Sequence, residues 1–208
     1  MHGLVNRFAE EFLRARYGEA LWREVATGCG VDPRGFLSWQ PQPDALTLQL
    51  ARRGAALIGV RVTDLAEDAG AWLAQIEAIR RLLRFGGRDY AEFLMSLDQL
   101  PGRAEMVVPG LGLPALGVTE GPGDRFVIRL EGGDPLWIRA TAGVLRQMAD
   151  DYGALALITP GRGSDSIVVE VPDRQFTLGR SFALVASSGA GASAPYLEAA
   201  LQEATSRM

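Results

Sequence analysis

The hydrophobic periodicity of the chain changes near residue 110, and this change restricts the folds that are open to it. Before that point, apolar side chains recur three and four residues apart, which is the spacing of one helix face. The helical segments expected from this spacing are 3–17, 19–27, 44–57, 64–83 and 90–100. After Pro109, Gly110, Gly112 and Pro114, short alternating runs dominate. The pattern predicts an α+β fold, helical first and with an antiparallel sheet in the second half.

Local signals indicate where two of these helices begin and end. Thr63 can cap the start of the helix over 64–83, and the pair Gly86-Gly87 can end it. Asp89 followed by Glu92 resembles a capping arrangement for the next helix. Pro101 is expected to end that helix, because a proline in a helix interior removes a backbone donor.

The second half alternates between turn signals and short apolar segments. A strand is expected over 125–130, directly after the turn residues 121–124, and a helix over 136–152. Two further strands are expected over 154–159 and 166–171. The sheet formed by these strands is expected to be antiparallel.

Chemistry that depends on histidine has no support in the sequence. The only histidine among the 208 residues is His2, whereas hydrolytic triads and histidine-based acid/base catalysis need an imidazole in a cleft. The Gly-rich segments 110–112 and 161–163 lack the lysine and the spacing of a phosphate-binding loop. The sequence therefore predicts a binding module and not an enzyme.

Cysteine usage and charge restrict the compartment and the partners. The single cysteine, Cys29, excludes an internal disulfide and a thiolate metal cluster, which fits a reducing cytoplasm. A net charge of −4 argues against nucleic acid as a partner. No apolar segment has the length of a membrane span or the form of a signal peptide. We therefore expect a cytoplasmic protein that binds neither membranes nor nucleic acid.

Two blocks of sequence resemble the heme nitric oxide/oxygen binding (H-NOX) family of sensor domains. The first comprises residues 1–6, Met-His-Gly-Leu-Val-Asn, and residues 16–22, Arg-Tyr-Gly-Glu-Ala-Leu-Trp. The second, residues 92–100, is similar to the end of the family's long proximal helix, and Pro114 falls where the family packs a proline against the porphyrin. The resemblance implies a helical N-terminal subdomain packed on a C-terminal subdomain that contains an antiparallel sheet and helices.

The resemblance also implies how the chain is divided. Residues 1–173 would form the H-NOX-like domain, with the helical subdomain over about 1–60 and the remainder over 61–173. Residues 174–208 would be a C-terminal extension without a counterpart in the short family members. Its sequence suggests a short strand over 176–185, a Gly/Ser/Ala tether over 187–193 and a terminal helix over 195–205.

The residues with which the family holds heme are missing from the matching positions. The family's iron-ligating histidine falls on Pro101. Its Tyr-x-Ser-x-Arg motif, which binds the heme propionates, falls on residues 131–135, Glu-Gly-Gly-Asp-Pro. Ala140 stands where some oxygen-binding members have a tyrosine. The resemblance therefore implies a divergent member that does not hold heme in the family manner.

Two functions are compatible with this pattern. The first, which we favour, is a heme-free module that binds a signalling partner or another small apolar ligand, with no cofactor or metal. The second is a heme-based nitric oxide sensor with a substitute axial ligand, for which His2, Cys29 and Met106 are the candidates, followed by Met95. Met95, Met106 and Met148 also fit a role as core fillers. The candidate pocket residues are Val5, Leu97, Leu100, Pro101, Pro114, Ala140 and Val144.

The partner implied by the resemblance is a separate signalling protein. Stand-alone family members regulate histidine kinases or cyclic-dinucleotide enzymes, so a protein of one of these kinds is expected. Motion of one subdomain against the other would carry the signal in this architecture.

Overall fold

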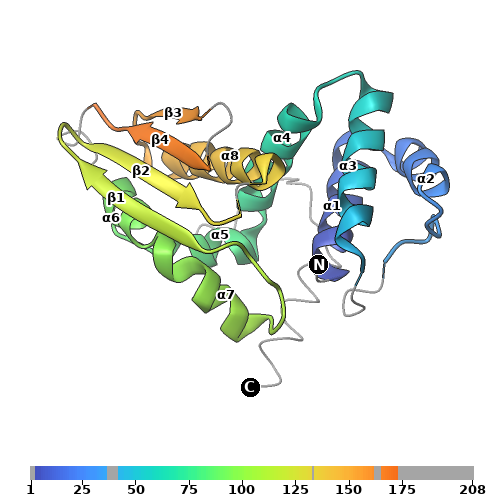
Figure 1. Ribbon diagram of the computed structural model, residues 1–208, viewed down its shortest axis with the longest axis horizontal. Helices are drawn as coiled ribbons and strands as arrows, with labels where there is room; N and C mark the ends of the chain where they lie inside the picture. Colours follow the sequence, from blue (N-terminus) through green and yellow to red (C-terminus); the bar gives the residue numbers. More distant parts are fainter. Residues whose placement is uncertain (1–2, 37–41, 133, 162–164, 173–208) are drawn as a thin grey trace, which may run out of the picture.

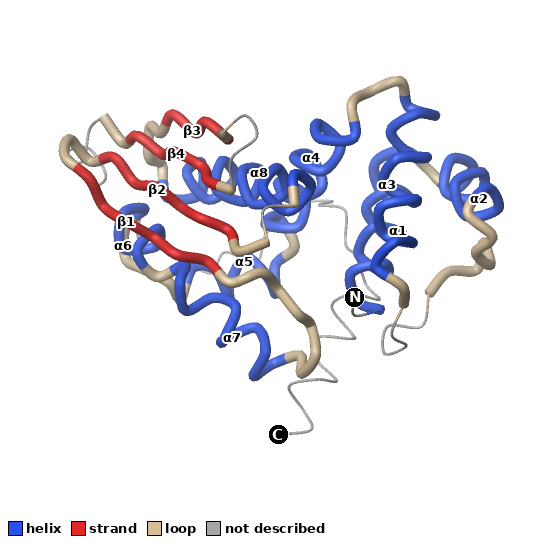
Figure 2. Tube along the Cα trace, viewed as in Figure 1, coloured by secondary structure: helices blue, strands red, loops and turns tan. Residues whose placement is uncertain are grey.

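The computed structural model describes residues 3–36, 42–132, 134–161 and 165–172. They form two halves (Figure 1 and Figure 2). The first half contains α1 (Gly3–Tyr17), α2 (Glu19–Gly28) and α3 (Asp44–Ile58). The second half is an antiparallel sheet with helices packed against one face. The α+β class expected from the change in periodicity is therefore confirmed.

Five helical elements connect α3 to the sheet. They are α4 (Val62–Gln75), α5 (Glu77–Arg84), α6 (Tyr90–Met95), the 3-10 turn η1 (Leu97–Gln99) and α7 (Leu100–Val107). The sheet half then contains β1 (Leu116–Gly121), β2 (Arg125–Leu130), α8 (Pro135–Tyr152), β3 (Leu157–Pro160) and β4 (Ser166–Glu170).

The four strands lie in the order β1-β2-β4-β3, and each neighbouring pair is antiparallel. Successive side chains of a strand point to opposite faces, so Phe126 and Ile128 are buried while Arg125 and Arg129 are exposed. Ile128 pairs with Ile167 across β2 and β4. The buried face is covered by α8 (Figure 1).

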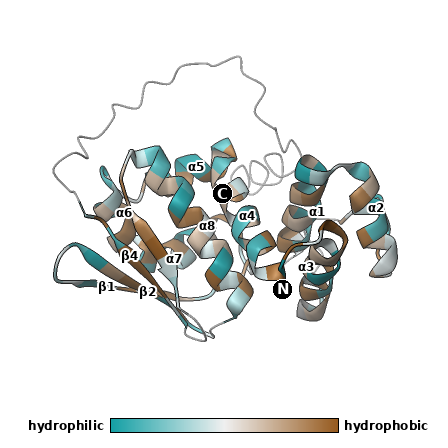
Figure 3. Ribbon diagram, turned by 90° about the horizontal axis from the view of Figure 1, so that it is seen from above, coloured by the Kyte–Doolittle hydropathy of each residue, from teal (hydrophilic) through white to brown (hydrophobic). Residues whose placement is uncertain are grey.

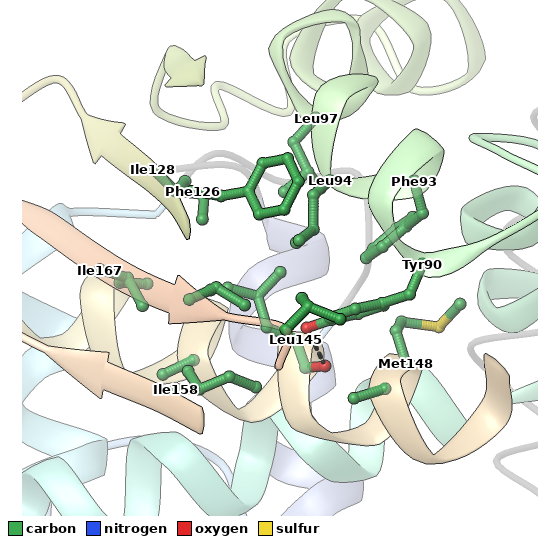
Figure 4. Packing of buried hydrophobic residues seen from close by; sticks show 14 of the residues in the cluster. Tyr90, Phe93, Leu94, Leu97, Phe126, Ile128, Leu145, Met148, Ile158 and Ile167 are labelled. Carbon is green, nitrogen blue, oxygen red and sulfur yellow. Dashed lines mark hydrogen bonds between the residues drawn. The ribbon is translucent and has the colours of Figure 1, made fainter. Parts of the chain in front are cut away.

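The buried apolar side chains form two clusters. The sheet cluster comprises side chains from α6, η1, the sheet and α8, among them Leu97, Phe126, Leu145 and Ile167 (Figure 4). The helical cluster comprises side chains from the first half and from α4, among them Phe12, Trp22, Val25, Leu50, Leu65 and Trp72. In Figure 3, α1, α2 and α3 each carry both apolar and polar residues. Burial of each large side chain contributes about 1.5–3 kcal/mol, so both clusters stabilise the fold substantially.

The helix α4 contributes to both clusters. Leu65 and Trp72 belong to the helical cluster, whereas Ala74, near the end of the same helix, belongs to the sheet cluster. α4 also packs along α8 over much of its length. The helix α4 therefore joins the two halves, because its residues pack in both clusters.

The helix predicted over 64–83 is two helices, because the backbone of Ile76 is extended between α4 and α5. The apolar stripe itself is confirmed, since Trp72, Ile76 and Leu83 are all buried. Thr63 is not the N-cap: α4 begins at Val62, and no side-chain cap is formed there.

Pro101 does not end a helix, contrary to the prediction. Instead it lies in the first turn of α7, where a proline is tolerated because the N–H groups of that turn have no helical acceptor. The predicted helix over 90–100 is divided between α6 and η1 and continues into α7.

The sheet contains one strand that the alternation did not predict, β1, half of whose residues are exposed. The strand expected over 154–159 begins only at Leu157. The segments 176–185, 187–193 and 195–205 lie outside the described residues. Among the described helices, none combines the length and apolar character needed to cross a membrane.

Candidate functional site

Pro101, which the sequence resemblance matches to the iron ligand of the H-NOX family, lies in the segment from α6 to α7. The proline ring is half-buried in the first turn of α7. Its nitrogen is part of the peptide bond and its ring carbons have no lone pair, so the side chain offers no ligand to a metal. Position 101 therefore contributes apolar surface only.

Two acidic side chains hold the start of α6. The Asp89 carboxylate accepts a hydrogen bond from the Glu92 backbone N–H at 2.9 Å, which confirms the expected cap. The Glu92 carboxylate accepts from the Arg88 guanidinium at 2.7 Å and from the Arg88 backbone N–H at 2.9 Å. These hydrogen bonds lower the pKa of Glu92 to about 2. The helix that leads towards Pro101 is thus fixed at its beginning.

The structure brings together part of the candidate pocket lining. Leu97 is buried in the sheet cluster, and Leu100 and Val144 pack against the same cluster. Figure 4 shows Leu97 and Leu94 next to Phe126. Three of the seven candidates therefore belong to the sheet cluster or pack against it.

The other candidates lie elsewhere on the two halves. Val5 is half-buried on α1, and Pro114 is half-buried just before β1. Ala140 lies on α8, where its backbone carbonyl faces Gly70 of α4. Its methyl group cannot donate a hydrogen bond to a bound gas.

Two glycines allow a close approach of α4 and α8. A side chain on Gly70 would collide with the Ala140 carbonyl, and one on Gly143 would collide with the Glu67 carbonyl. The Glu67 carboxylate also pairs with Arg139 at 3.3 Å and with Arg146. Sequence analysis did not single out this contact, although a glycine inside a helical pattern often marks such close packing.

The resemblance matches residues 131–135 to the family's propionate-binding motif, and the described residues of this segment form a turn and a helix cap. The Asp134 carboxylate caps α8 by accepting the Leu136 backbone N–H at 2.7 Å. Glu131 and Gly132 form the turn after β2, and Gly132 has a φ of 84°. Gly133 lies outside the described residues. Glu131 and Asp134 thus add two exposed carboxylates to this segment, and a carboxylate repels an anionic group placed beside it.

Among the candidate axial ligands, Cys29 packs against a different apolar cluster from the residues next to Pro101, whereas Met106 lies on α7 with Pro101. His2 lies outside the described residues. Cys29 packs against the helical cluster, whereas Leu97 and Leu100 belong to the sheet cluster. Burial raises the pKa of the Cys29 thiol, and the nearby Arg53 charge opposes that shift. In the part of the chain that the structure describes, no three His, Cys, Asp or Glu side chains are placed to share a metal ion.

The methionine predictions divide into two outcomes. Met148 is fully buried, as expected of a core filler. Met95 and Met106 are not core fillers, since 42% and 65% of their surfaces are exposed. Met95 ends α6 and Met106 lies in the last turn of α7, and both side chains are exposed there.

Comparison with known proteins identifies the family. The model of the Haem-NO-binding family matches residues 2–155, so the chain belongs to this family, also called H-NOX. Soluble guanylate cyclase 89Db of Drosophila melanogaster is 21% identical over 158 residues, which cover 74% of this chain and 24% of the cyclase. The chain thus spans about a quarter of the length of that curated relative.

Solved structures with the same fold support this assignment. A single-residue mutant of the T. tengcongensis H-NOX has a TM-score of 0.71 at 16% identity, with 85% of this chain and all of that chain covered. An S. oneidensis H-NOX protein in the Fe(II)NO state has a TM-score of 0.70 at 15% identity, with 83% of this chain and all of that chain covered. The H-NOX-like fold expected from the resemblance is confirmed, and domains of this family are sensor modules.

Proposed function

We propose that this chain is an H-NOX sensor module that does not hold heme in the family manner. The observation that carries the proposal is Pro101, which offers no metal ligand from the first turn of α7. Heme binding in the family depends on an imidazole–iron bond, and the resemblance matches that imidazole to Pro101.

The surroundings of Pro101 and of the α8 N-terminus support the same conclusion. Asp134 is engaged as a helix cap, and Glu131 is exposed beside it, so carboxylates stand where the family has donors. Leu97 belongs to the sheet cluster, and Leu100 and Val144 pack against it, so these three candidates supply apolar surface and no ligand to a metal. The module then acts by binding a signalling partner or another small ligand, and the partner is a separate protein such as a histidine kinase or a cyclic-dinucleotide enzyme.

An absorption spectrum tests the proposal. The full chain is expressed with excess heme precursor, the apo protein is titrated with hemin, and nitric oxide is added to the reduced sample. We expect no stoichiometric Soret band and no shift with nitric oxide. An unrelated protein without a heme site, treated in the same way, controls for non-specific hemin adsorption.

A sharp stoichiometric Soret band that shifts with nitric oxide would overturn the heme-free proposal. It would instead support a gas sensor with substitute ligation. The substitutions His2→Ala, Cys29→Ser and Met106→Leu would then identify the ligand, because only the replaced ligand changes the position of the band.

A further inference from the structure

A groove between α2 and α3 lies on the first half, away from Pro101. This open groove has a volume of about 430 Å³, and Gly28 at the end of α2 borders it. We call it the α2–α3 groove; the side chains that line it are Cys29, Gln49, Arg52, Arg53, Ala56 and Leu57. Figure 1 shows α2 and α3 side by side at the edge of the molecule.

The groove has two arginines without an acidic partner. Among the residues that the structure describes, neither Arg52 nor Arg53 forms an ion pair, whereas Arg7, Arg14 and Arg61 each pair with a carboxylate. Both guanidinium groups therefore keep their charge and donors available for an anion.

Arg53 is positioned by the end of α2. A side chain on Gly28 would collide with the Arg53 guanidinium, so this group lies directly against the helix backbone. The C-terminus of a helix carries partial negative charge, which stabilises a cation there without neutralising it. The guanidinium is thus presented at the groove in a defined place.

The other side of the groove is apolar and open. Ala56 and Leu57 are exposed, and Val60, one turn after Ala56, is 42% exposed. Most of the lining side chains face solvent, so a small molecule would keep much of its surface in water, unlike ligands of enclosed pockets. A protein segment would instead cover the groove and its surroundings together.

We propose that the α2–α3 groove docks an acidic segment of a partner protein. Carboxylates of the segment pair with Arg52 and Arg53, in the bidentate geometry that guanidinium groups favour. An apolar side chain of the same segment packs on Ala56 and Leu57. This proposal rests on the proposed function and extends it, because it assigns a docking surface to this chain and an acidic segment to the partner.

The test uses the full chain and a short amphipathic peptide of Ala, Leu and Glu, followed by backbone amide NMR. We expect shift changes centred on Gly28, Cys29 and Ala56. In the double variant Arg52→Gln/Arg53→Gln, we expect the peptide to bind about 5- to 10-fold more weakly, the effect of losing two exposed ion pairs. Raised salt is expected to weaken binding to the unmodified chain.

The control variant Arg16→Gln/Arg129→Gln removes the same charge from exposed positions outside the groove, and should bind the peptide like the unmodified chain. A second variant, Ala56→Glu, places an acid in the groove and should also weaken binding. Equal binding of a Gln-for-Glu peptide, an equal loss in the control variant, or shift changes centred elsewhere would each overturn the proposal. A heme spectrum that contradicts the heme-free proposal leaves this titration unaffected, so the two proposals fail separately.

Discussion

The backbone carbonyl of Ala140 on α8 occupies the space that a side chain on Gly70 of α4 would need. Both partners of this contact belong to regular helices, so neither can move alone without breaking helical hydrogen bonds. The close spacing of α4 and α8, and with it the placement of Ala140, thus requires that residue 70 has no side chain.

Gly70→Ala should therefore destabilise the protein by about 2–3 kcal/mol, because the overpacked methyl group forces two backbones apart. Urea unfolding followed by circular dichroism measures the change. Gly102→Ala on α7 is the matched control, since no atom lies near the added methyl group. It should stabilise by up to about 1 kcal/mol, the ordinary gain for alanine in a helix. Equal midpoints for the two variants would disprove the close contact.

Asp134→Ala should cost about 1 kcal/mol, because it removes the cap from the first turn of α8. Glu131→Ala, an exposed acid on the same turn, should leave the free energy of unfolding nearly unchanged. Thermal unfolding of both variants decides the point. If the two variants melted together, Asp134 would have no capping role.

Stability should respond to acid through Glu92. Its pKa in the folded protein, about 2, lies below the ordinary value of 4.5, so the stabilisation is complete above pH 4.5 and is lost as pH falls towards 2. The difference in unfolding free energy between the unmodified chain and Glu92→Gln should shrink over this window. Glu131→Gln is the control. A difference that stayed constant from neutral pH to pH 2 would contradict the assignment.

Pro101→His should increase hemin binding over that of the unmodified chain, because it returns an imidazole to the first turn of α7. The helix should tolerate the change, since proline is not required there. The height of the Soret band at equal hemin measures the effect. Gly102→His, one residue along the same helix, is the control and should not produce this increase. If both variants behaved alike, position 101 would not face a heme site.

Much of the fold was predictable because its signals are local. The helix predicted over 3–17 matches α1, and the strand over 125–130 matches β2. The break at Ile76 was not predictable, since an apolar stripe with helical spacing continues through it and no glycine or proline marks it. β1 was not predicted because its pairing with β2, and not its own alternation, holds it in the sheet.

The sequence could predict which side-chain types stand at the candidate site, but not where the fold places them. That Pro101 stands at the position of the family's iron ligand is a prediction from the resemblance, whereas its place in the first turn of α7 depends on how the chain continues after η1. Met106 is exposed because of where α7 lies in the folded chain, and the tertiary structure, not the local sequence, decides that position. The availability of Arg52 and Arg53 likewise depends on where the nearby carboxylates lie in the folded chain.

The division of α4 between the helical cluster and the sheet cluster has a consequence for folding. Leu65, Trp72 and Ala74 lie on one continuous backbone, so loss of either cluster removes packing from a helix that the other needs. The halves should therefore melt in a single cooperative transition. Because one helix contributes to both clusters, the contacts that hold the two halves together are made by the polypeptide itself.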